Sequence, residues 1–208
     1  TVGDVDAIII PGTRNSTEDM FTLRKSGLAD KIIEKSKEIP IVGICGGLQI
    51  LGNIIHDKEK RESKHGTIEG LGLLDIESEF SRAGKIVTQS EATIPDNLDG
   101  LVGEIFKNIA GESVAGYEIH EGTSKLLNST ALLNISKGQG NNDDDVIDGA
   151  CNGNIFATYF HGIFHNYNFR REFLNYIRAK KGLETKYGED PYETQKDYSL
   201  NKLAEIVE

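Results

Sequence analysis

The chain has 208 residues, which is enough for one domain that buries most of its apolar surface without disulfide bonds. Its hydrophobic content of 38% and charged content of 27% are ordinary for a soluble globular protein. The formal net charge of −10 makes nucleic acid a poor candidate partner, because an acidic protein repels the phosphate backbone.

Further function classes are excluded by what the sequence lacks. Two cysteines, Cys45 and Cys151, are too few for a disulfide framework, so we expect a reduced, cytoplasmic setting. No apolar run approaches the roughly 18 residues that span a bilayer, and we expect no membrane partner. There is no Gly-x-x-x-x-Gly-Lys-[Ser/Thr] phosphate loop and no metal-ligand spacing, and residues 143–145 indicate a solvated acidic turn rather than a calcium loop.

The first fifty residues alternate between strands and helices. An apolar run at residues 5–10 is typical of a strand buried on both faces. Residues 13–17 form a polar turn with good helix N-caps, and the helix that follows is interrupted at Gly27. A second helix ends before Pro40, and residues 41–44 form the next strand. This β-α-β-α order predicts a parallel sheet covered by helices.

The remaining segments are less regular, and we assign them from apolar spacing and turn residues. We expect a solvated charged loop at 56–65, a half-buried strand at 73–80 with Leu74, Ile76 and Phe80 on one face, antiparallel strands or hairpins at 85–118, and a surface loop at 136–154. Toward the C-terminus we expect a strand at 155–160, a helix at 169–178 that ends by Gly182, and a short amphipathic helix at 200–207.

The most informative feature is a buried strand that leads directly into Cys45, two glycines and a helix. A thiol attacks as the thiolate, and a helix N-terminus lowers the thiol pKa through its N–H groups. The N–H of Gly46, which follows the nucleophile, is a natural oxyanion-hole donor. Gly12 and Thr13 end the preceding strand at the same edge of the sheet and offer a second donor. Gln49 shares a helix face with Cys45, where its amide is able to bind an amide or a carboxylate.

A cysteine nucleophile needs a base, which is often distant in the sequence. The best candidate is His161, because it follows the apolar run at 155–160. His120 is a weaker candidate that we expect to line the pocket or to hold Tyr117 and Glu118 in place. The residues alone also allow a non-catalytic interpretation of each side chain. Cys45 is then a buried structural cysteine, and His161 is a structural histidine whose hydrogen bonds are all made within the protein.

Five motifs occur in order along the chain: residues 11–19, 43–49, 70–74, 116–120 and 158–164. Together they resemble the glutamine amidotransferase domains of the cobyric acid synthase family, which belong to the class I (triad-type) glutamine amidotransferases. The match covers nearly the whole chain. It implies a three-layer α/β fold of flavodoxin-like type, with a mostly parallel sheet flanked by helices, and one glutamine amidotransferase domain over residues 1–208.

The resemblance implies a cysteine-based glutaminase mechanism. Cys45 attacks the side-chain amide of glutamine while His161 takes the thiol proton and then protonates the departing ammonia. A glutamyl thioester forms, and water hydrolyses it to glutamate. The other site residues that the resemblance implies are Gly12 and Gly46 in the oxyanion hole, with Thr13, Gln49 and His120 expected around the bound glutamine.

One departure from the triad pattern concerns the residue that orients the histidine. Other triad enzymes carry a Glu two residues after the histidine, where this chain has Ile163. The cobyric acid synthase branch also lacks that Glu, so a Cys-His dyad is expected. Glu118 is a possible orienting residue for His161.

The resemblance also implies a partner. In the family, an ATP-dependent synthetase domain precedes the amidotransferase domain and amidates carboxylates of the corrin ring in cobalamin biosynthesis. This sequence opens on Thr1 without that half, so we expect a C-terminal piece of a longer chain, with little glutaminase activity when isolated. The implied partners are glutamine, the synthetase domain and, through it, the corrin. ATP and Mg are expected in the synthetase domain, and no cofactor is expected in this one.

Alternatives stay open at this point. The glutaminase could serve a related amidotransferase, either a cobyrinate a,c-diamide synthase or the enzyme that amidates lipid II. A cysteine hydrolase or peptidase could use the same nucleophile. A non-catalytic docking module is the third alternative, and Ile163 in place of Glu favours it.

Overall fold

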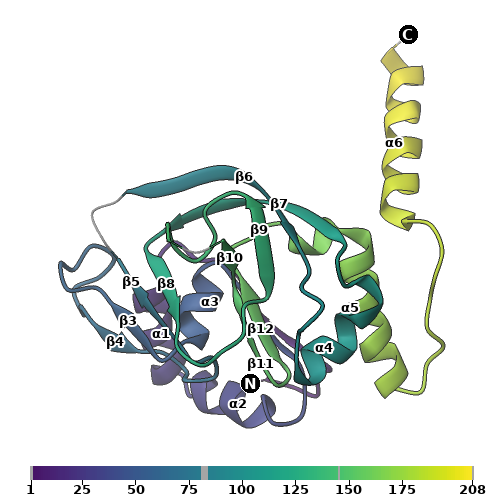
Figure 1. Ribbon diagram of the computed structural model, residues 1–208. Coiled ribbons are helices and arrows are strands. Elements are labelled where there is room, and N and C mark those ends of the chain that lie inside the picture. Colours follow the sequence, from purple (N-terminus) through teal and green to yellow (C-terminus); the bar gives the residue numbers. More distant parts are fainter. Residues whose placement is uncertain (1, 81–83, 145, 208) are drawn as a thin grey trace.

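The computed structural model describes residues 2–80, 84–144 and 146–207 (Figure 1). Its central sheet has the spatial order β1 (Ile8–Ile10), β2 (Ile41–Ile44), β12 (Ile155–Thr158) and β11 (Ala150–Asn152). The first three of these strands run parallel, and β11 is antiparallel at the edge. The mostly parallel sheet that the sequence predicts is therefore confirmed.

Alternate residues of the two inner strands face two separate apolar cores, because successive side chains of a strand point to opposite faces. Ile41 and Ile155 belong to one core, whereas Val42 and Phe156 belong to the other. The first core packs against α1 (Ser16–Lys25), α2 (Leu28–Lys35) and α3 (Gly46–Leu51). The second packs against α4 (Gly100–Phe106), α5 (Tyr167–Lys180) and the two 3₁₀ turns Lys107–Ile109 and Ile163–His165. The sheet is thus the middle of three layers.

Two further sheets complete the body. One is antiparallel, with the order β10 (Ile147–Asp148), β9 (Leu133–Lys137), β6 (Lys85–Thr93) and β7 (Ser113–Glu121). The other has the order β4 (Ile68–Glu69), β3 (Ile54–His56), β5 (Ile76–Glu79) and β8 (Thr123–Leu126), in which β3 and β5 are the parallel pair. The long β6–β7 ribbon arches across the edge of the body (Figure 1).

Most local predictions hold where the chain is strongly patterned. Asn15 caps α1, its side chain accepting the Glu18 N–H at 2.9 Å, and Gly27 separates α1 from α2 with a φ of 73°. The antiparallel strands expected within 85–118 are β6 and β7, although α4 between them was not predicted. Residues 136–154 are not one surface loop, because β10 and β11 lie within them.

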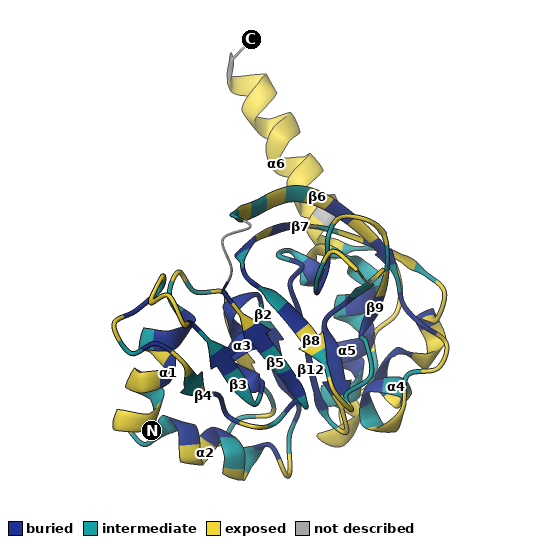
Figure 2. Cartoon of the chain, turned by 60° about the vertical axis from the view of Figure 1, so that its left-hand side comes forward, coloured by how far each residue is buried: buried dark blue, intermediate teal, exposed yellow. Residues whose placement is uncertain are grey.

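The C-terminal helix is longer and more isolated than its pattern predicts. α6 spans Pro191–Val207 and projects away from the body, with its described side chains exposed (Figure 2). The apolar side of the 200–207 pattern therefore packs on none of the residues that the structure describes.

Two findings concern features that the described residues lack. Within the described ranges, no helix combines the length and the apolar character needed to cross a membrane. Across the same ranges, His, Cys, Asp and Glu side chains form no cluster of three that is able to hold a metal ion. In the acidic turn, Asp143 and Asp144 are exposed, and Asp145 lies outside the described residues.

Candidate active site

Cys45 lies at the sharp turn between β2 and α3. Its N–H donates to the Thr158 carbonyl at 2.8 Å, and its φ of 53° is positive. A positive φ is strained for a residue with a side chain, and it is typical of the strand-to-helix turn that presents a nucleophile. Gly47 has to be glycine here, because an alanine Cβ would lie 2.2 Å from the Ile10 carbonyl oxygen. The turn therefore depends on close backbone packing against β1.

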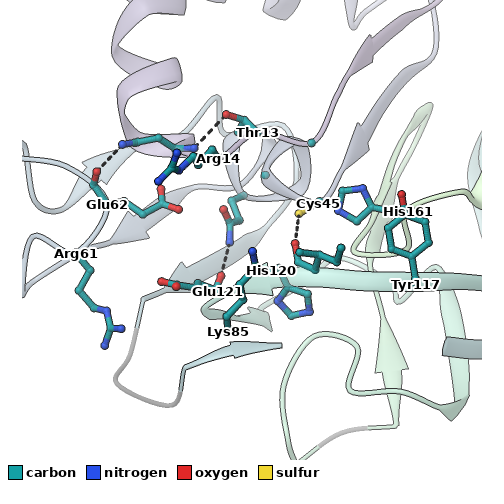
Figure 3. Close-up of a pocket in the computed structure, with 15 residues that line it drawn as sticks. Thr13, Arg14, Cys45, Arg61, Glu62, Lys85, Tyr117, His120, Glu121 and His161 are labelled. Atoms are coloured by element: carbon teal, nitrogen blue, oxygen red, sulfur yellow. Dashed lines mark hydrogen bonds between the residues drawn. The ribbon is translucent and has the colours of Figure 1, made fainter. Parts of the chain in front are cut away.

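The Cys45 side chain lines a pocket of about 820 Å³ (Figure 3). The walls come from the loop after β1, the start of α3, the charged loop at 57–65, the ends of β6 and β7, and the segment after β12. The predicted site residues that line it are Gly12, Thr13, Cys45, Gly46, Gln49, His120 and His161. Only Glu118, among the residues predicted for the site, does not line it.

His161 follows β12 and lies beside Cys45 (Figure 3). An alanine Cβ at Gly12 would lie 2.8 Å from His161 Cε1 and 3.5 Å from Cys45 Cβ, so both side chains flank the same glycine. Tyr117 stacks on the imidazole with 5.1 Å between ring centroids and 10° between planes, and it exchanges two backbone hydrogen bonds with His161. Nε2 of His161 is buried without a hydrogen-bond partner in the described structure. This nitrogen is therefore available to accept a proton.

The carbonyl group of Ile119 connects the thiol with the imidazole. Cys45 Sγ donates to this oxygen at 3.5 Å, and the same carbonyl acts to raise the pKa of His161. A carbonyl oxygen favours a neighbouring group that carries a proton. The site as described therefore holds the proton on sulfur.

The predicted lowering of the Cys45 thiol pKa is wrong for this structure. The pKa of the Cys45 thiol is raised to about 11, mainly by burial and to a smaller extent by the charges of Glu62 and Asp148. The Gly46 N–H and the charge of Lys85 lower it, but they do not outweigh burial. The helix-terminus argument failed because it counted the N–H groups and neglected desolvation.

The imidazole is suited to act as a base. Burial lowers the pKa of His161 below its usual value, and the neighbouring His120 lowers it further, against the Ile119 carbonyl. The ring is consequently neutral at neutral pH. A protonated thiol beside a neutral imidazole is a pair in which proton transfer accompanies attack.

The two glycines predicted for the oxyanion hole lie on neighbouring walls. An alanine Cβ at Gly46 would lie 2.5 Å from Thr13 Cγ2 and 3.3 Å from Thr13 N, so the two loops are in close contact. The Thr13 hydroxyl donates to Asp19 and accepts the Asn15 N–H at 3.1 Å, which shapes the first loop. The roles of Gly12 and Gly46 as donors to an oxyanion stay a prediction.

Gln49 is buried in the wall of the pocket, with 3% of its surface exposed. Its Nε2 donates to the Glu121 carbonyl at 3.2 Å and to the Tyr159 hydroxyl at 3.3 Å. These bonds fix the amide group in place. Contact between Gln49 and bound glutamine stays a prediction.

The prediction that Glu118 orients His161 is wrong in this structure. Both oxygens of its buried carboxylate are occupied, accepting from Ser90, His120 and the N–H groups of Gln139 and Gly140. Although burial raises the pKa of Glu118, these hydrogen bonds outweigh it and lower the pKa. Strand alternation also places Glu118 on the face of β7 opposite to Tyr117. Glu118 therefore orients His120, which stacks on Tyr159 at 3.9 Å.

The charged loop at 57–65 is a wall of the pocket, which the sequence did not predict. Asp57 is buried and accepts the N–H groups of Arg61, Glu62 and Ser63, so the loop has a fixed shape. Glu62 Oε2 accepts the N–H and the hydroxyl of Ser16 at 2.9 and 3.0 Å. Burial raises the pKa of Glu62 above its usual value. An acidic residue followed by several polar residues is too common a pattern to have revealed this role.

The position of the missing triad carboxylate is apolar. Ile163 is 1% exposed and belongs to the core that contains Phe169 and Phe173. A carboxylate there would be buried among aromatic rings. The structure therefore places no carboxylate two residues after His161, and the Cys–His dyad stays a prediction.

The geometry and the comparisons with known proteins point to one family. A family model for the CobB/CobQ-like glutamine amidotransferase domain matches residues 1–169. The chain belongs to this family, which confirms the resemblance seen in the sequence.

The curated relatives give a more particular likeness. The chain is 47% identical over 209 residues to a probable cobyric acid synthase from Methanothermobacter thermautotrophicus, and 42% identical over 209 residues to a cobyric acid synthase from Dehalococcoides mccartyi. These matches cover 100% and 99% of this chain and 40% of each relative. The chain therefore spans about two fifths of the length of these relatives.

Solved structures support the fold. The chain resembles the structure of PurLQS from Thermotoga maritima with a TM-score of 0.61 and 22% identity, over 85% of this chain and 82% of that one. It also resembles the crystal structure of a glutamine amidotransferase with a TM-score of 0.53 and 16% identity, over 86% and 80% of the two chains. Both likenesses bear on the three-layer α/β architecture alone.

Proposed function

We propose that this domain hydrolyses the side-chain amide of glutamine to glutamate and ammonia. The observation that carries the proposal is the meeting of the Cys45 thiol, the neutral His161 imidazole and the Ile119 carbonyl at one pocket. Membership of the glutamine amidotransferase family supports the same reaction.

The reaction begins with proton transfer from Cys45 to His161 as sulfur attacks the amide carbon. Negative charge develops on the amide oxygen, and the N–H groups of Gly12 and Gly46 are the proposed donors to it. The carbon–nitrogen bond then breaks, and the imidazolium returns its proton to the leaving nitrogen, which departs as ammonia. The neutral imidazole next takes a proton from water as the water attacks the thioester. The carbon–sulfur bond breaks, glutamate leaves and the thiol regains its proton.

The charges around the pocket favour a free amino acid over a peptide. Glu62 and Glu121 supply negative charge, and Arg14, Arg61 and Lys85 supply positive charge. Free glutamine carries one ammonium and one carboxylate at its α-carbon, whereas a glutamine inside a peptide carries neither. Side chains of both signs offer a counter-charge for each group.

The use of the ammonia is a further part of the proposal. The relatives named cobyric acid synthase are about two and a half times as long as the matched region, which leaves room for a synthetase portion. We propose that this portion binds ATP and Mg and uses the ammonia to amidate carboxylates of a corrin. A reducing cytoplasm suits the reaction, because both cysteines are free thiols and the nucleophile has to stay reduced.

Covalent labelling tests the glutaminase reaction. The glutamine analogue 6-diazo-5-oxo-L-norleucine should alkylate Cys45, and free glutamine should protect it. A peptide that protects the thiol when glutamine does not would instead indicate a peptidase.

The variant Cys45→Ser tests whether catalysis is needed at all. In the intact protein, this variant should abolish glutamine-dependent amidation and keep amidation that is driven by added ammonium. Survival of the glutamine-dependent reaction would show that the domain is only a docking module.

A further inference from the structure

Asp148 is a buried carboxyl group that the proposed reaction does not use. It ends β10 and is 0% exposed. Its Oδ1 accepts the Tyr159 N–H at 3.0 Å, and its Oδ2 accepts the Thr158 hydroxyl. Both hydrogen bonds reach the short segment that connects β12 to His161.

This segment bonds the backbone of the nucleophile Cys45 and leads directly into the base His161. Thr158 is the last residue of β12, and beyond it the N–H groups no longer pair within the sheet, so they need other acceptors. Asp148 supplies one acceptor for Tyr159, and the Thr158 hydroxyl oxygen supplies another for the Phe160 N–H at 2.9 Å. The Thr158 carbonyl accepts the Cys45 N–H at 2.8 Å. One carboxyl group thus organises the peptide that holds the nucleophile and the residues just before the base.

A buried carboxyl group carries a larger desolvation cost than an uncharged hydrogen-bond acceptor would at this place. Burial without a cationic partner penalises the charged form, and the charge of Glu118 adds to the penalty, so the pKa of Asp148 rises to about 7. An uncharged Asn would supply an acceptor without that penalty. Strongly perturbed buried carboxyl groups occur more often at functional sites than elsewhere.

We propose that Asp148 is a positioning residue for the Cys45–His161 pair, and that it acts through Thr158 and the Tyr159 N–H. The proposal rests on the glutaminase function proposed above. Ile163, two residues after His161, is a buried apolar residue and offers the ring no carboxylate. Asp148 instead fixes the backbone from which the ring projects.

Paired variants at Thr158 test the proposal in the intact protein. Thr158→Val removes the hydroxyl group that connects Asp148 with Phe160, and Thr158→Ser restores it. Asp148→Asn keeps an acceptor for Tyr159 but replaces the acceptor of the Thr158 hydroxyl by a donor. We expect kcat for glutamine hydrolysis to fall roughly 10- to 100-fold in Thr158→Val and Asp148→Asn, because small misplacements of reacting groups cost about that much. KM should change less than about 3-fold, since neither side chain lines the pocket. Thr158→Ser should stay within about 3-fold of the parent in kcat.

Active-site titration separates positioning from folding. The fraction of Cys45 that 6-diazo-5-oxo-L-norleucine labels at completion counts the folded sites, and kcat is expressed per labelled site. Asn175→Ala is the matched control, because Asn175 is 5% exposed and bonds both backbone polar groups of Lys186, and neither residue lines the pocket or bonds Asp148 or Thr158. It should lower the melting temperature while kcat per labelled site stays the same.

The outcomes distinguish this inference from the function on which it rests. If kcat per labelled site in Thr158→Val and Asp148→Asn equals that of the parent, Asp148 is only structural and the inference is overturned. If Asp148→Asn does not fold, the comparison of Thr158→Val with Thr158→Ser decides alone. If the parent protein neither reacts with the diazoketone nor hydrolyses glutamine, the glutaminase proposal fails and this inference fails with it.

Discussion

Gly12→Ala tests how closely the two reacting side chains are packed. The new Cβ would lie 2.8 Å from His161 Cε1, where ordinary contacts begin at 3.4 Å, so the imidazole has to retreat by about 0.6 Å. Tyr117 stacks on the same ring, and a retreat disturbs that stacking. The φ of Gly12 is not positive, so alanine adds no backbone strain.

The expected effect is on rate more than on stability. Misplacement of a reacting group by about 1 Å can cost roughly 100-fold, so we expect kcat/KM for glutamine to fall between 10- and 100-fold. The melting temperature should change little, because the side chain that moves lines an open pocket. Steady-state glutaminase kinetics, active-site titration and thermal unfolding together measure these quantities.

Gly3→Ala is the control for Gly12→Ala. An alanine Cβ at Gly3 meets nothing within 4 Å, so this variant should match the parent in every assay. If Gly12→Ala keeps kcat/KM within about 2-fold of the parent, the proposed packing of His161 against Gly12 and Cys45 is refuted.

The remaining predictions concern charge. Burial lowers the pKa of His161, so the acid limb of the pH profile of kcat/KM should have its midpoint below pH 6.5, the usual pKa of histidine. A midpoint above pH 6.5 would contradict the assignment of His161 as the base. Glu62→Gln should raise KM for glutamine about 10-fold with little change in kcat, if Glu62 binds the α-ammonium group, and Glu104→Gln on the exposed face of α4 is the control. The pKa of Asp148 is raised to about 7, so its contribution to stability is fully present below about pH 4 and is lost as pH rises through 7. Urea unfolding of Asp148→Asn should therefore show a smaller loss of stability between pH 5 and pH 8 than the parent; equal losses contradict the raised pKa.

The parts of this protein that the sequence determined are those with local signals. Apolar runs and the glycine and proline breaks between them are enough to place β1, α1, α2, β2 and α3, because the signal for each of these elements lies in its own residues. The same local pattern identified Cys45, since a strand followed by two glycines and a helix has few other uses. His161 needed the additional argument that a thiol requires a base.

Tertiary structure decided the rest, because the deciding contacts join distant parts of the chain. The Cys45 thiol meets the Ile119 carbonyl 74 residues away, and Glu62 meets Ser16 46 residues away. No local pattern reports such pairs. Desolvation is also a property of the folded chain. The sequence argument for Cys45 therefore gave the wrong direction for the shift of its pKa. For the same reason, only the folded chain shows that the buried carboxyl group of Glu118 serves His120 and that of Asp148 serves the segment before His161.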